Sequence, residues 1–472
     1  MSHVLVLGAG PCGLMTAMLL ARDGHRVTLL ERDSAPPPDD AASAAGAWER
    51  KGVAQFEQAH FMHARFRQLL DAELPNVRDV LKESGATTWN QLGSLPPFIE
   101  DQQPRPDDDR FWTITARRPV LEAAIAHAAF REPSVTIRRG TKVASLLTGA
   151  EVVSGAPHVT GVRTQGGEDI EAELVVDAMG RRTPMPDLLK ATGGRPPEAE
   201  AFDCGFTYYT RYFRSRDGKY PDMIGPPLAP LGTISCLTLP ADNQTWFIVL
   251  FTNSRDAPLK ALRHADKWEA VVRAVPFQAH WLEGEPVSGV LPMSGIVDGL
   301  RRYVVDGAPV VTGMVPVADA WACTNPSLGR GVTMGLTHAV QLRDAVRKDL
   351  DDPKRLAESF DAVTTTELEP WFRAQVQMDR ARFAEMDALR EGREPPPPPD
   401  TEDGRLMRAF LTAAPYDGDL FRAFMEYVSS QSLPSEILSR PGMAERALEV
   451  AEGKEAFAPP APDRSELLAL LS

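Results

Sequence analysis

The sequence predicts an α/β fold that is interrupted by an antiparallel sheet and followed by a helical region. Three patterns lead to this prediction. The chain opens with two short apolar runs on either side of an amphipathic helix, which is a β-α-β pattern. Strand-like segments follow one another between residues 206 and 251, and helical periodicity dominates after residue 353. We therefore expect a first domain with a parallel sheet, a second domain with its own sheet, and a C-terminal helical region.

The composition is that of a folded protein with an acidic balance. The 472 residues include 51 Lys and Arg against 65 Asp and Glu, for a formal net charge of −14. This surplus of acid argues against nucleic acid as a partner, because binding phosphates needs a basic surface. The four cysteines have no CxxC spacing, so we expect neither a metal site nor disulfides. No apolar run is long enough for a membrane span, and a cytoplasmic location is the expectation.

A glycine motif lies at the first strand-to-helix turn. Apolar residues 3–7 predict a buried parallel strand, and apolar positions at helical spacing in residues 14–21 predict the helix that follows. Gly8 permits a tight turn, Gly10 lets a pyrophosphate approach the backbone, and Gly13 allows the helix to pack closely on the strand. We therefore expect a Rossmann-like dinucleotide-binding domain, with Pro11 and Cys12 in the same phosphate-binding turn.

The second strand of this pattern ends in an acidic residue. Residues 26–31 read as a strand, and Glu31 closes it about 20 residues after the glycines, where an acid accepts hydrogen bonds from a ribose. Arg32 follows and is expected beside the same ligand. The other interpretation is a glycine turn in an α/β domain without a nucleotide. The motif by itself does not separate NAD from FAD.

Two later segments resemble a known family. Residues 174–183 (LVVDAMGRRT) are similar to a strand-DATGRxS element, and residues 317–331 (VADAWACTNPSLGRG) to a GDAxxxxxPxxGxG segment. Both elements are typical of the FAD-dependent monooxygenases of the para-hydroxybenzoate hydroxylase-like fold, with their epoxidase, halogenase and geranylgeranyl reductase relatives. The three motifs follow the family's order over roughly residues 1–345. The resemblance implies that the cofactor is FAD.

The resemblance also implies the residues on the flavin side. Asp319 would accept hydrogen bonds from the ribityl hydroxyls, although a helix N-cap is the other interpretation. Residues 326–331 would pass the flavin ring, and the backbone N–H groups of the next helix would stabilise the reduced ring. Arg118 is favoured over Arg117 for the phosphates or ribityl chain, and Val143 for a backbone contact to adenine. The expected contacts here are Arg118, Val143, Asp319, Pro326, Gly329, Gly331 and Val332.

The sequence departs from its relatives in three places. Residues 177–180 read Asp-Ala-Met-Gly instead of the DG motif of single-component aromatic hydroxylases, and no second GxGxxG unit provides an NADPH domain. The chain also has no Trp-x-Trp-x-Ile-Pro segment, which makes a halogenase a weaker expectation. Ala318 stands where relatives usually have glycine. We therefore expect the flavin to be reduced by transient NAD(P)H or by a partner flavin reductase.

The expected activity follows from the resemblance. It is an FAD-dependent monooxygenase that uses O2 and a flavin C4a-(hydro)peroxide to epoxidise or hydroxylate an apolar small molecule, in secondary metabolism. The rivals are a flavin-dependent reductase or dehydrogenase of the geranylgeranyl reductase type, a halogenase, and a non-catalytic FAD-binding protein. No catalytic acid or base is assigned. His60 and His63 have HxxH spacing, but no third ligand follows, so no metal is expected.

The motifs also predict how the chain is divided. The FAD-binding domain is expected in residues 1–60, 105–200 and 300–350, and the substrate domain in residues 61–104 and 201–299. Residues 351–472 form the helical region, with an exposed loop at the prolines 395–399. Segments 135–139, 143–147, 158–164 and 170–176 are expected to form one small sheet. The polar and aromatic residues 208–214 either line a substrate pocket or pack inside a sheet.

Overall fold

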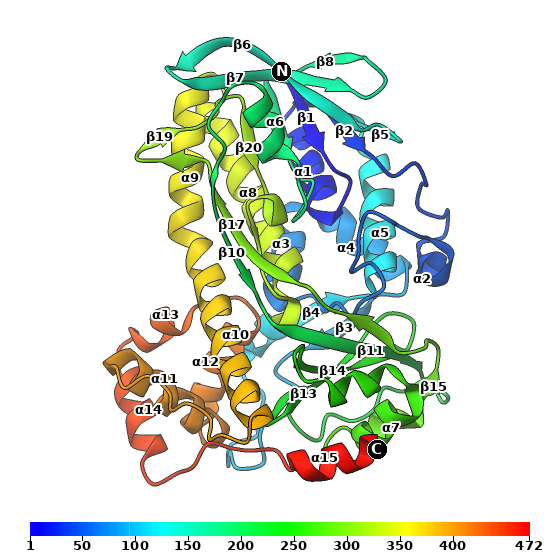
Figure 1. Ribbon diagram of the computed structural model, residues 1–472, viewed down its shortest axis with the longest axis vertical. Coiled ribbons are helices and arrows are strands. Elements are labelled where there is room, and N and C mark those ends of the chain that lie inside the picture. The colour runs from blue at the N-terminus through cyan, green and yellow to red at the C-terminus, as the bar shows by residue number, and fades with distance from the viewer. Residues whose placement is uncertain (94) are drawn as a thin grey trace.

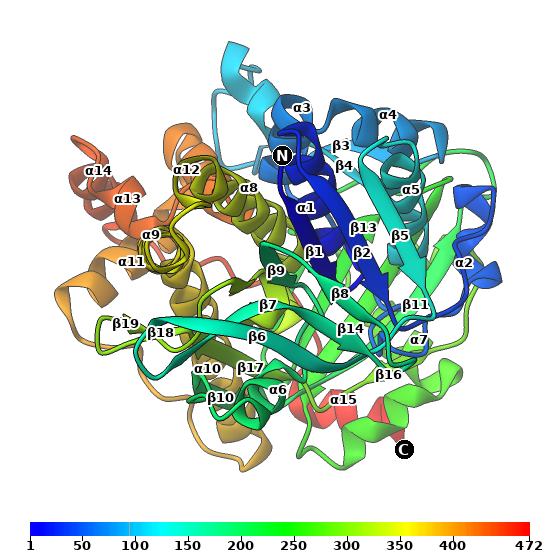
Figure 2. The ribbon, with the colours of Figure 1, turned by 90° about the horizontal axis from the view of Figure 1, so that it is seen from above.

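A parallel five-stranded sheet forms the centre of the nucleotide-binding part (Figures 1 and 2). The computed structural model describes residues 1–93 and 95–472. The strands come from distant parts of the chain, as the interrupted pattern predicts. In spatial order they are β20 (Met314–Pro316), β9 (Leu174–Asp177), β1 (His3–Leu7), β2 (Arg26–Glu31) and β5 (Val135–Arg139).

Both faces of this sheet are covered, which explains the continuous apolar run of β1. Val4 and Val6 pack into a helical layer, whereas Leu5 and Leu7 pack against a second, three-stranded sheet on the other face. Figure 2 shows the two layers on either side of the strands. The helical layer holds α1 (Pro11–Arg22), α5 (Arg118–Phe130) and α8 (Gly331–Asp349), and the small sheet holds β6 (Val143–Val153), β7 (Ala156–Thr164) and β8 (Asp169–Glu171).

The predicted small sheet differs from the observed one at both ends. Only β6, β7 and β8 form it, while 135–139 and 174–177 are strands of the central sheet. Their sequences explain this outcome only in part, because alternation predicts a strand but not its partner. Before β20, the short strands β18 (Val304–Val305) and β19 (Ala308–Pro309) form a hairpin.

Helices α3 (Ala64–Glu73) and α4 (Pro75–Glu83) belong to the helical layer of the central sheet. Phe66, Leu70 and Leu81 are buried in the same hydrophobic cluster as α1, α5 and α8. The domain prediction instead grouped residues 61–104 with the substrate domain. The order of segments in the sequence does not show that α3 and α4 pack on the central sheet, because amphipathic helices fit either apolar surface. After α4, the strands β3 (Thr87–Asn90) and β4 (Trp112–Thr115) pair with each other.

The second sheet is antiparallel, and its central strands lie where the sequence predicts them. Helix α7 (Ala265–Arg273) covers its outer face, where Tyr209 and Phe213 pack on Trp268. The opposite face carries Tyr208 and Tyr212 in another apolar cluster. The strands are β12 (Leu228–Leu231), β13 (Ile234–Pro240), β14 (Thr245–Asn253), β11 (Phe206–Arg214), β15 (Glu285–Pro286) and β16 (Leu291–Met293).

A long antiparallel ribbon joins the two parts of the molecule (Figure 1). It consists of β10 (Glu198–Asp203) and β17 (Val297–Arg302), and β21 (Ala322–Cys323) adds to β17. Two short helices, α2 (Ala44–Ala47) and α6 (Met185–Ala191), lie in the nucleotide-binding part. Because β21 comes directly before residues 326–331, the ribbon fixes one end of the segment that the sequence associates with the flavin.

The C-terminal region is helical, as predicted, and touches both parts. Figure 1 shows α9 and α10 as a column along one side, with α11 to α14 beside its lower end and α15 beside α7. The prolines 395–399 lie in an exposed loop without helix or strand. The helices are α9 (Pro353–Glu367), α10 (Glu369–Arg390), α11 (Glu402–Ala413), α12 (Gly418–Val428), α13 (Pro434–Leu438), α14 (Met443–Ala451) and α15 (Arg464–Leu471). Among the described residues, no helix is long and apolar enough to cross a membrane.

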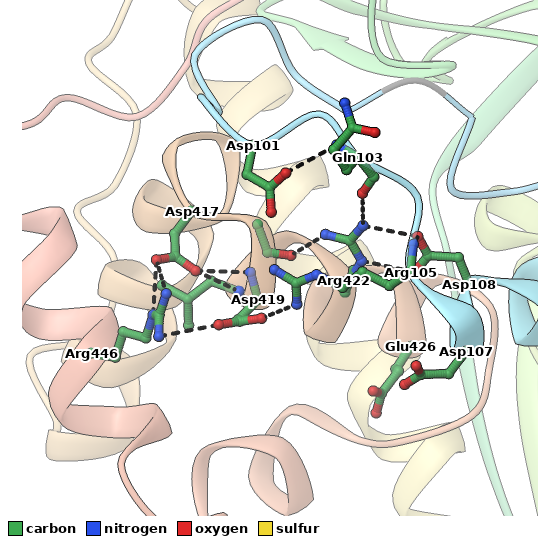
Figure 3. Close-up of polar contacts among 12 residues, drawn as sticks. Asp101, Gln103, Arg105, Asp107, Asp108, Asp417, Asp419, Arg422, Glu426 and Arg446 are labelled. Atoms are coloured by element: carbon green, nitrogen blue, oxygen red, sulfur yellow. Dashed lines mark hydrogen bonds and ion pairs between the residues drawn. The ribbon is translucent and has the colours of Figure 1, made fainter.

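Ion pairs attach the C-terminal region to the segment that precedes β4 (Figure 3). Arg422 on α12 makes two 2.8 Å hydrogen bonds to the carboxylate of Asp108, and both side chains are buried. Arg105 pairs with Asp419 at the start of the same helix, and Arg446 on α14 reaches Asp419 at 3.1 Å. These contacts hold α12 in a defined position on the rest of the molecule.

Candidate cofactor and substrate site

The three glycines of the first turn have different surroundings. Gly8 has a φ of +106°, and a Cβ atom there would lie 2.6 Å from the carbonyl oxygen of Ala178. A Cβ atom on Gly13 would lie 2.1 Å from the carbonyl oxygen of Gly8. At Gly10, by contrast, a Cβ atom would have no other atom within 4 Å. The turn is therefore tightly packed at Gly8 and Gly13 and open at Gly10, which fits a pyrophosphate lying over Gly10.

Glu31 lies at the end of β2 beside this turn. It is 4% exposed, and its carboxylate accepts hydrogen bonds from the backbone N–H groups of Ala9 and Asp33, both at 2.9 Å. These bonds hold the acid at the strand end where the sequence predicts it. The neighbouring Arg32 is exposed and donates to the carbonyl oxygen of Gly52 at 2.9 Å. The amide of Thr141 donates to the carbonyl oxygen of Glu31 at 2.9 Å, which brings the start of β6, with Val143, close to the same strand end.

Arg50 is a site residue that the sequence did not single out. Its guanidinium is buried between two carboxylates, with an ion pair to Glu31 and another to Glu122 at 2.7 Å. Close to it, the indole N–H of Trp48 and two guanidinium nitrogens of Arg139 are buried without a hydrogen-bond partner. Such unpaired buried donors fit a polar ligand at this edge of the sheet. Arg50 follows a loop without a motif, so no sequence pattern points to it.

The structure separates Arg117 from Arg118, which the sequence could not do. Arg117 donates to both carboxylate oxygens of Asp242, so it joins α5 to the second sheet. Arg118 instead points along α5, with 2.6 Å between its Nε and the Oε1 of Glu122. Arg118 also donates to the Nε2 of His60 at 3.0 Å. Arg118 thus belongs to the same group of charges as Arg50, close to the glycine turn.

His60 is neutral in this arrangement. Burial, followed by the charge of Arg118, lowers the pKa of His60 to about 3. Its Nδ1 donates to the carbonyl oxygen of Gln58 at 2.9 Å, which leaves Nε2 free to accept from Arg118. His63 lies elsewhere and pairs with the hydroxyl of Ser430 at 2.6 Å. The two histidines therefore have separate partners, and no group of metal ligands is found in residues 1–93 and 95–472.

Asp319 follows β20 and faces the start of α8. A Cβ atom on Gly331, the first residue of α8, would lie 4.0 Å from its Oδ1 atom. Burial raises the pKa of Asp319. The N-cap of α8 is Arg330, so Asp319 does not cap this helix. The preceding Ala318 has a φ of +53°, which is a glycine-like conformation and explains why relatives usually have glycine there.

Cys12 packs between two helices. A Cβ atom on Gly335 of α8 would lie 2.3 Å from its Sγ atom, so this glycine lets α1 and α8 approach each other. Burial and the nearby Asp319 raise the pKa of the Cys12 thiol, which remains protonated. Pro11 is the first residue of α1. A backbone N–H at this position has no hydrogen-bond partner within the helix, so proline, which lacks the N–H, removes no helical hydrogen bond.

Residues 326–331 form a fixed loop before α8. Gly329 has a φ of +67°, and Val332 in the first turn of α8 is buried. The amide of Asn325 donates to Asp298 of β17 at 2.5 Å, and the hydroxyl of Ser327 donates to Asp379 of α10 at 2.8 Å. The loop that carries Pro326, Gly329 and Gly331 is thus held from the ribbon and from the C-terminal region.

The second sheet faces this loop with aromatic side chains. Tyr208 on β11 donates to the side-chain oxygen of Asn325 at 2.6 Å, and Thr210 on the same strand donates to Gln58 at 2.9 Å. Tyr208 stacks on Phe251, and the apolar cluster around them continues to Phe61 and Phe247. Of the two interpretations of residues 208–214, packing describes what the structure shows, because Tyr209 and Phe213 are buried in the cluster on the outer face and Tyr208 and Tyr212 in the cluster on the inner face. Gln58 and Asn325 carried no signal in the sequence.

Comparison with known proteins finds a matching family model and two relatives by sequence. The model of the FAD dependent oxidoreductase family matches residues 3–112. Protein Rv3254 of Mycobacterium tuberculosis is 26% identical over 373 residues, which cover 73% of this chain and 73% of that protein. The FAD-dependent monooxygenase fsr3 of Gibberella fujikuroi is 28% identical over 204 residues, which cover 40% of this chain and 35% of fsr3.

Solved structures share the fold over most of the chain. A mutant of PqsL from Pseudomonas aeruginosa aligns with a TM-score of 0.60 at 18% identity, over 82% of this chain and 98% of that one. OxyS, the anhydrotetracycline hydroxylase from Streptomyces rimosus, aligns with a TM-score of 0.54 at 18% identity, over 92% of this chain and 76% of that one. At these identities the likeness concerns the fold.

The glycine turn and the acid at the end of β2 lie within residues 3–112, which match the FAD dependent oxidoreductase family. Over 92% of its length the chain also shares the fold of the hydroxylase OxyS. The family match and the shared fold both agree with the resemblance that the segments at 174–183 and 317–331 indicated.

Proposed function

We propose that the protein is an FAD-dependent monooxygenase that hydroxylates or epoxidises an apolar small molecule. One atom of O2 enters the substrate, and the other leaves as water. The two electrons that this step needs come from NAD(P)H, either directly or through a flavin reductase. The relative fsr3, named as an FAD-dependent monooxygenase, supports this proposal.

The observation that carries the proposal is the aromatic face of the second sheet opposite the loop 326–331. The hydrogen bond from Tyr208 to Asn325 joins the two directly. Bound FAD would supply electron transfer and oxygen activation at this loop. The side chains around Tyr208, Phe247 and Phe251 would exclude water and hold an apolar substrate, and excluding water is what this chemistry needs from a protein.

The same proposal gives each group of residues one task. The turn around Gly10 would hold the pyrophosphate, and Glu31, with Arg50 close by, would hold the adenosine side. Asp319 would accept hydrogen bonds from the ribityl chain, and the N-terminus of α8 would face the pyrimidine edge of the ring. No side chain is proposed as a catalytic acid or base.

The proposal is tested with reduced enzyme and labelled oxygen. The FAD-loaded protein is reduced without oxygen and then mixed with 18O2 in the presence of apolar aromatic or polyene compounds. We expect a transient absorbance that differs from both oxidised and reduced flavin, and one 18O atom in a product. Immediate reoxidation that yields only hydrogen peroxide across the compound set would contradict the proposal, and reduction of a compound without oxygen would favour a reductase.

Asp319→Ala is expected to weaken FAD binding. The loss should be about 1.5–3 kcal/mol, because the hydrogen bonds that the variant removes involve a charged group. The measurement is the FAD dissociation constant of the apoprotein, followed by flavin fluorescence. The control is Asp39→Ala in an exposed loop, which should bind as the wild type does. An unchanged dissociation constant for Asp319→Ala would remove this residue from the site.

A further inference from the structure

Arg330 is a buried arginine without a carboxylate partner. It lies at the N-cap of α8, between Gly329 and Gly331 of the loop described above, and it is 3% exposed. Over residues 1–93 and 95–472, no carboxylate lies within ion-pair distance of its guanidinium. Two of its nitrogens, Nε and Nη1, are also buried without a hydrogen-bond partner.

The contacts of Arg330 come from the C-terminal helices. Its Nη2 donates to the carbonyl oxygen of Tyr427 on α12 at 3.1 Å. The guanidinium carbon lies 4.4 Å from the ring centre of Tyr427 and 5.0 Å from that of Trp371 on α10. Aromatic faces attract a cation by about 0.5–2 kcal/mol each, and this attraction leaves the charge itself in place. An arginine side chain stays protonated in proteins.

Other charged groups near the loop do not neutralise this cation. The two carboxylate oxygens of Asp379 accept hydrogen bonds from Ser327 and from Gln375, each at 2.8 Å. Burial raises the pKa of Asp379 and of Asp319. The nearby His63 is neutral, because burial and the charge of Arg330 lower its pKa to about 3. The positive field of Arg330 therefore extends into the loop.

We propose that Arg330 is a positioning residue that places a buried positive charge beside the N-terminus of α8 and so favours reduced, anionic flavin over oxidised flavin. This inference rests on the proposed function, since it needs FAD at residues 326–331. The charge acts without touching the ring. In a low-dielectric interior, a fixed charge and the end of a helix dipole of the same sign reinforce each other.

The proposal also gives the C-terminal region a role. Arg330 is held by Trp371 and Tyr427, which belong to helices α10 and α12. Helix α12 is in turn attached to the segment before β4 through Arg422 and Asp108 (Figure 3). The C-terminal helices thus keep the cation next to the cofactor loop, although they come last in the sequence.

The test measures the two-electron midpoint potential of the FAD-loaded protein. Arg330→Met removes the charge, and we expect the preference for reduced over oxidised flavin to fall at least tenfold. For a two-electron couple, this corresponds to a midpoint potential that is lower by about 30 mV. Arg330→Lys keeps the charge and should keep most of the potential. The matched control is Arg343→Met on the same helix, because Arg343 is paired with Glu73 far from the loop and should leave the potential unchanged.

The results separate an electrostatic role from a structural one. A wild-type potential in a flavin-loaded Arg330→Met variant overturns the proposal, and so does a Lys variant that is lowered as much as the Met variant. Arg330→Gln takes the place of the Met variant if that variant does not fold. If neither neutral variant folds, Arg330 serves stability and the proposal is overturned. A wild-type protein that binds no FAD would instead contradict the proposed function, which keeps the two failures distinct.

Discussion

Gly10→Val is expected to give a folded protein that retains no FAD. The structure leaves free space around position 10, since a Cβ atom there would meet no other atom within 4 Å. The side chain would therefore not disturb the packing of α1 on the sheet. It would instead occupy the place where the pyrophosphate approaches the backbone. Flavin absorbance of the purified variant and its circular dichroism spectrum measure the two parts of this expectation.

Gly13→Ala is the contrasting variant. Its Cβ atom would lie 2.1 Å from the carbonyl oxygen of Gly8, so the helix must move away from the strand. We expect Gly13→Ala to lower the free energy of unfolding. A loss of flavin in this variant would then reflect the disturbed packing and not a lost contact to the pyrophosphate. A Gly10→Val protein with full flavin absorbance would contradict the placement of the pyrophosphate at Gly10. Loss of the folded spectrum in Gly10→Val would contradict the open space around this residue.

Asp108→Asn is expected to destabilise the protein by about 3–5 kcal/mol, the range measured when one partner of a buried ion pair is removed. Asp108 and Arg422 are both buried, and their two 2.8 Å hydrogen bonds attach α12 to the segment before β4 (Figure 3). The variant leaves the guanidinium of Arg422 without a counter-ion. Denaturant unfolding of the full chain measures the free energy of unfolding.

The neighbouring Asp107 provides a matched control. Its carboxylate pairs with Arg110 at 2.6 Å, but its side chain is 73% exposed. Exposed ion pairs contribute about 0–1 kcal/mol, so Asp107→Asn should stay close to the wild type. Equal effects of the two substitutions would contradict the assignment of Asp108 and Arg422 as the stabilising pair.

The same ion pair predicts a dependence on pH. The hydrogen bonds from Arg422 lower the pKa of Asp108 below its usual range. An acid whose pKa is lowered by folding contributes stability above the unfolded pKa, which is about 3.9 for aspartate, and loses this contribution as the pH falls through the folded pKa. The difference in unfolding free energy between wild type and Asp108→Asn should therefore shrink below about pH 4. A constant difference down to low pH would contradict this cause.

Local sequence patterns predicted the first turn, the strands of the second sheet and the helices of the C-terminal region. Each of these features depends on neighbours within a few residues. Gly8, Gly10 and Gly13 follow a strand and open a helix, and the acid at position 31 closes the next strand. Such patterns are readable because backbone conformation and periodicity are set locally.

The sequence by itself therefore determined the class of fold and the cofactor that the turn and the family resemblance imply. Only the tertiary structure decided which residues meet there. It separated Arg118 from Arg117, brought Arg50 and His60 to the glycine turn, and placed Arg330 between helices that follow it by dozens of residues. The reason is physical: ion pairs and aromatic contacts depend on distances in space, and segments far apart in the chain carry no common periodicity that would reveal them.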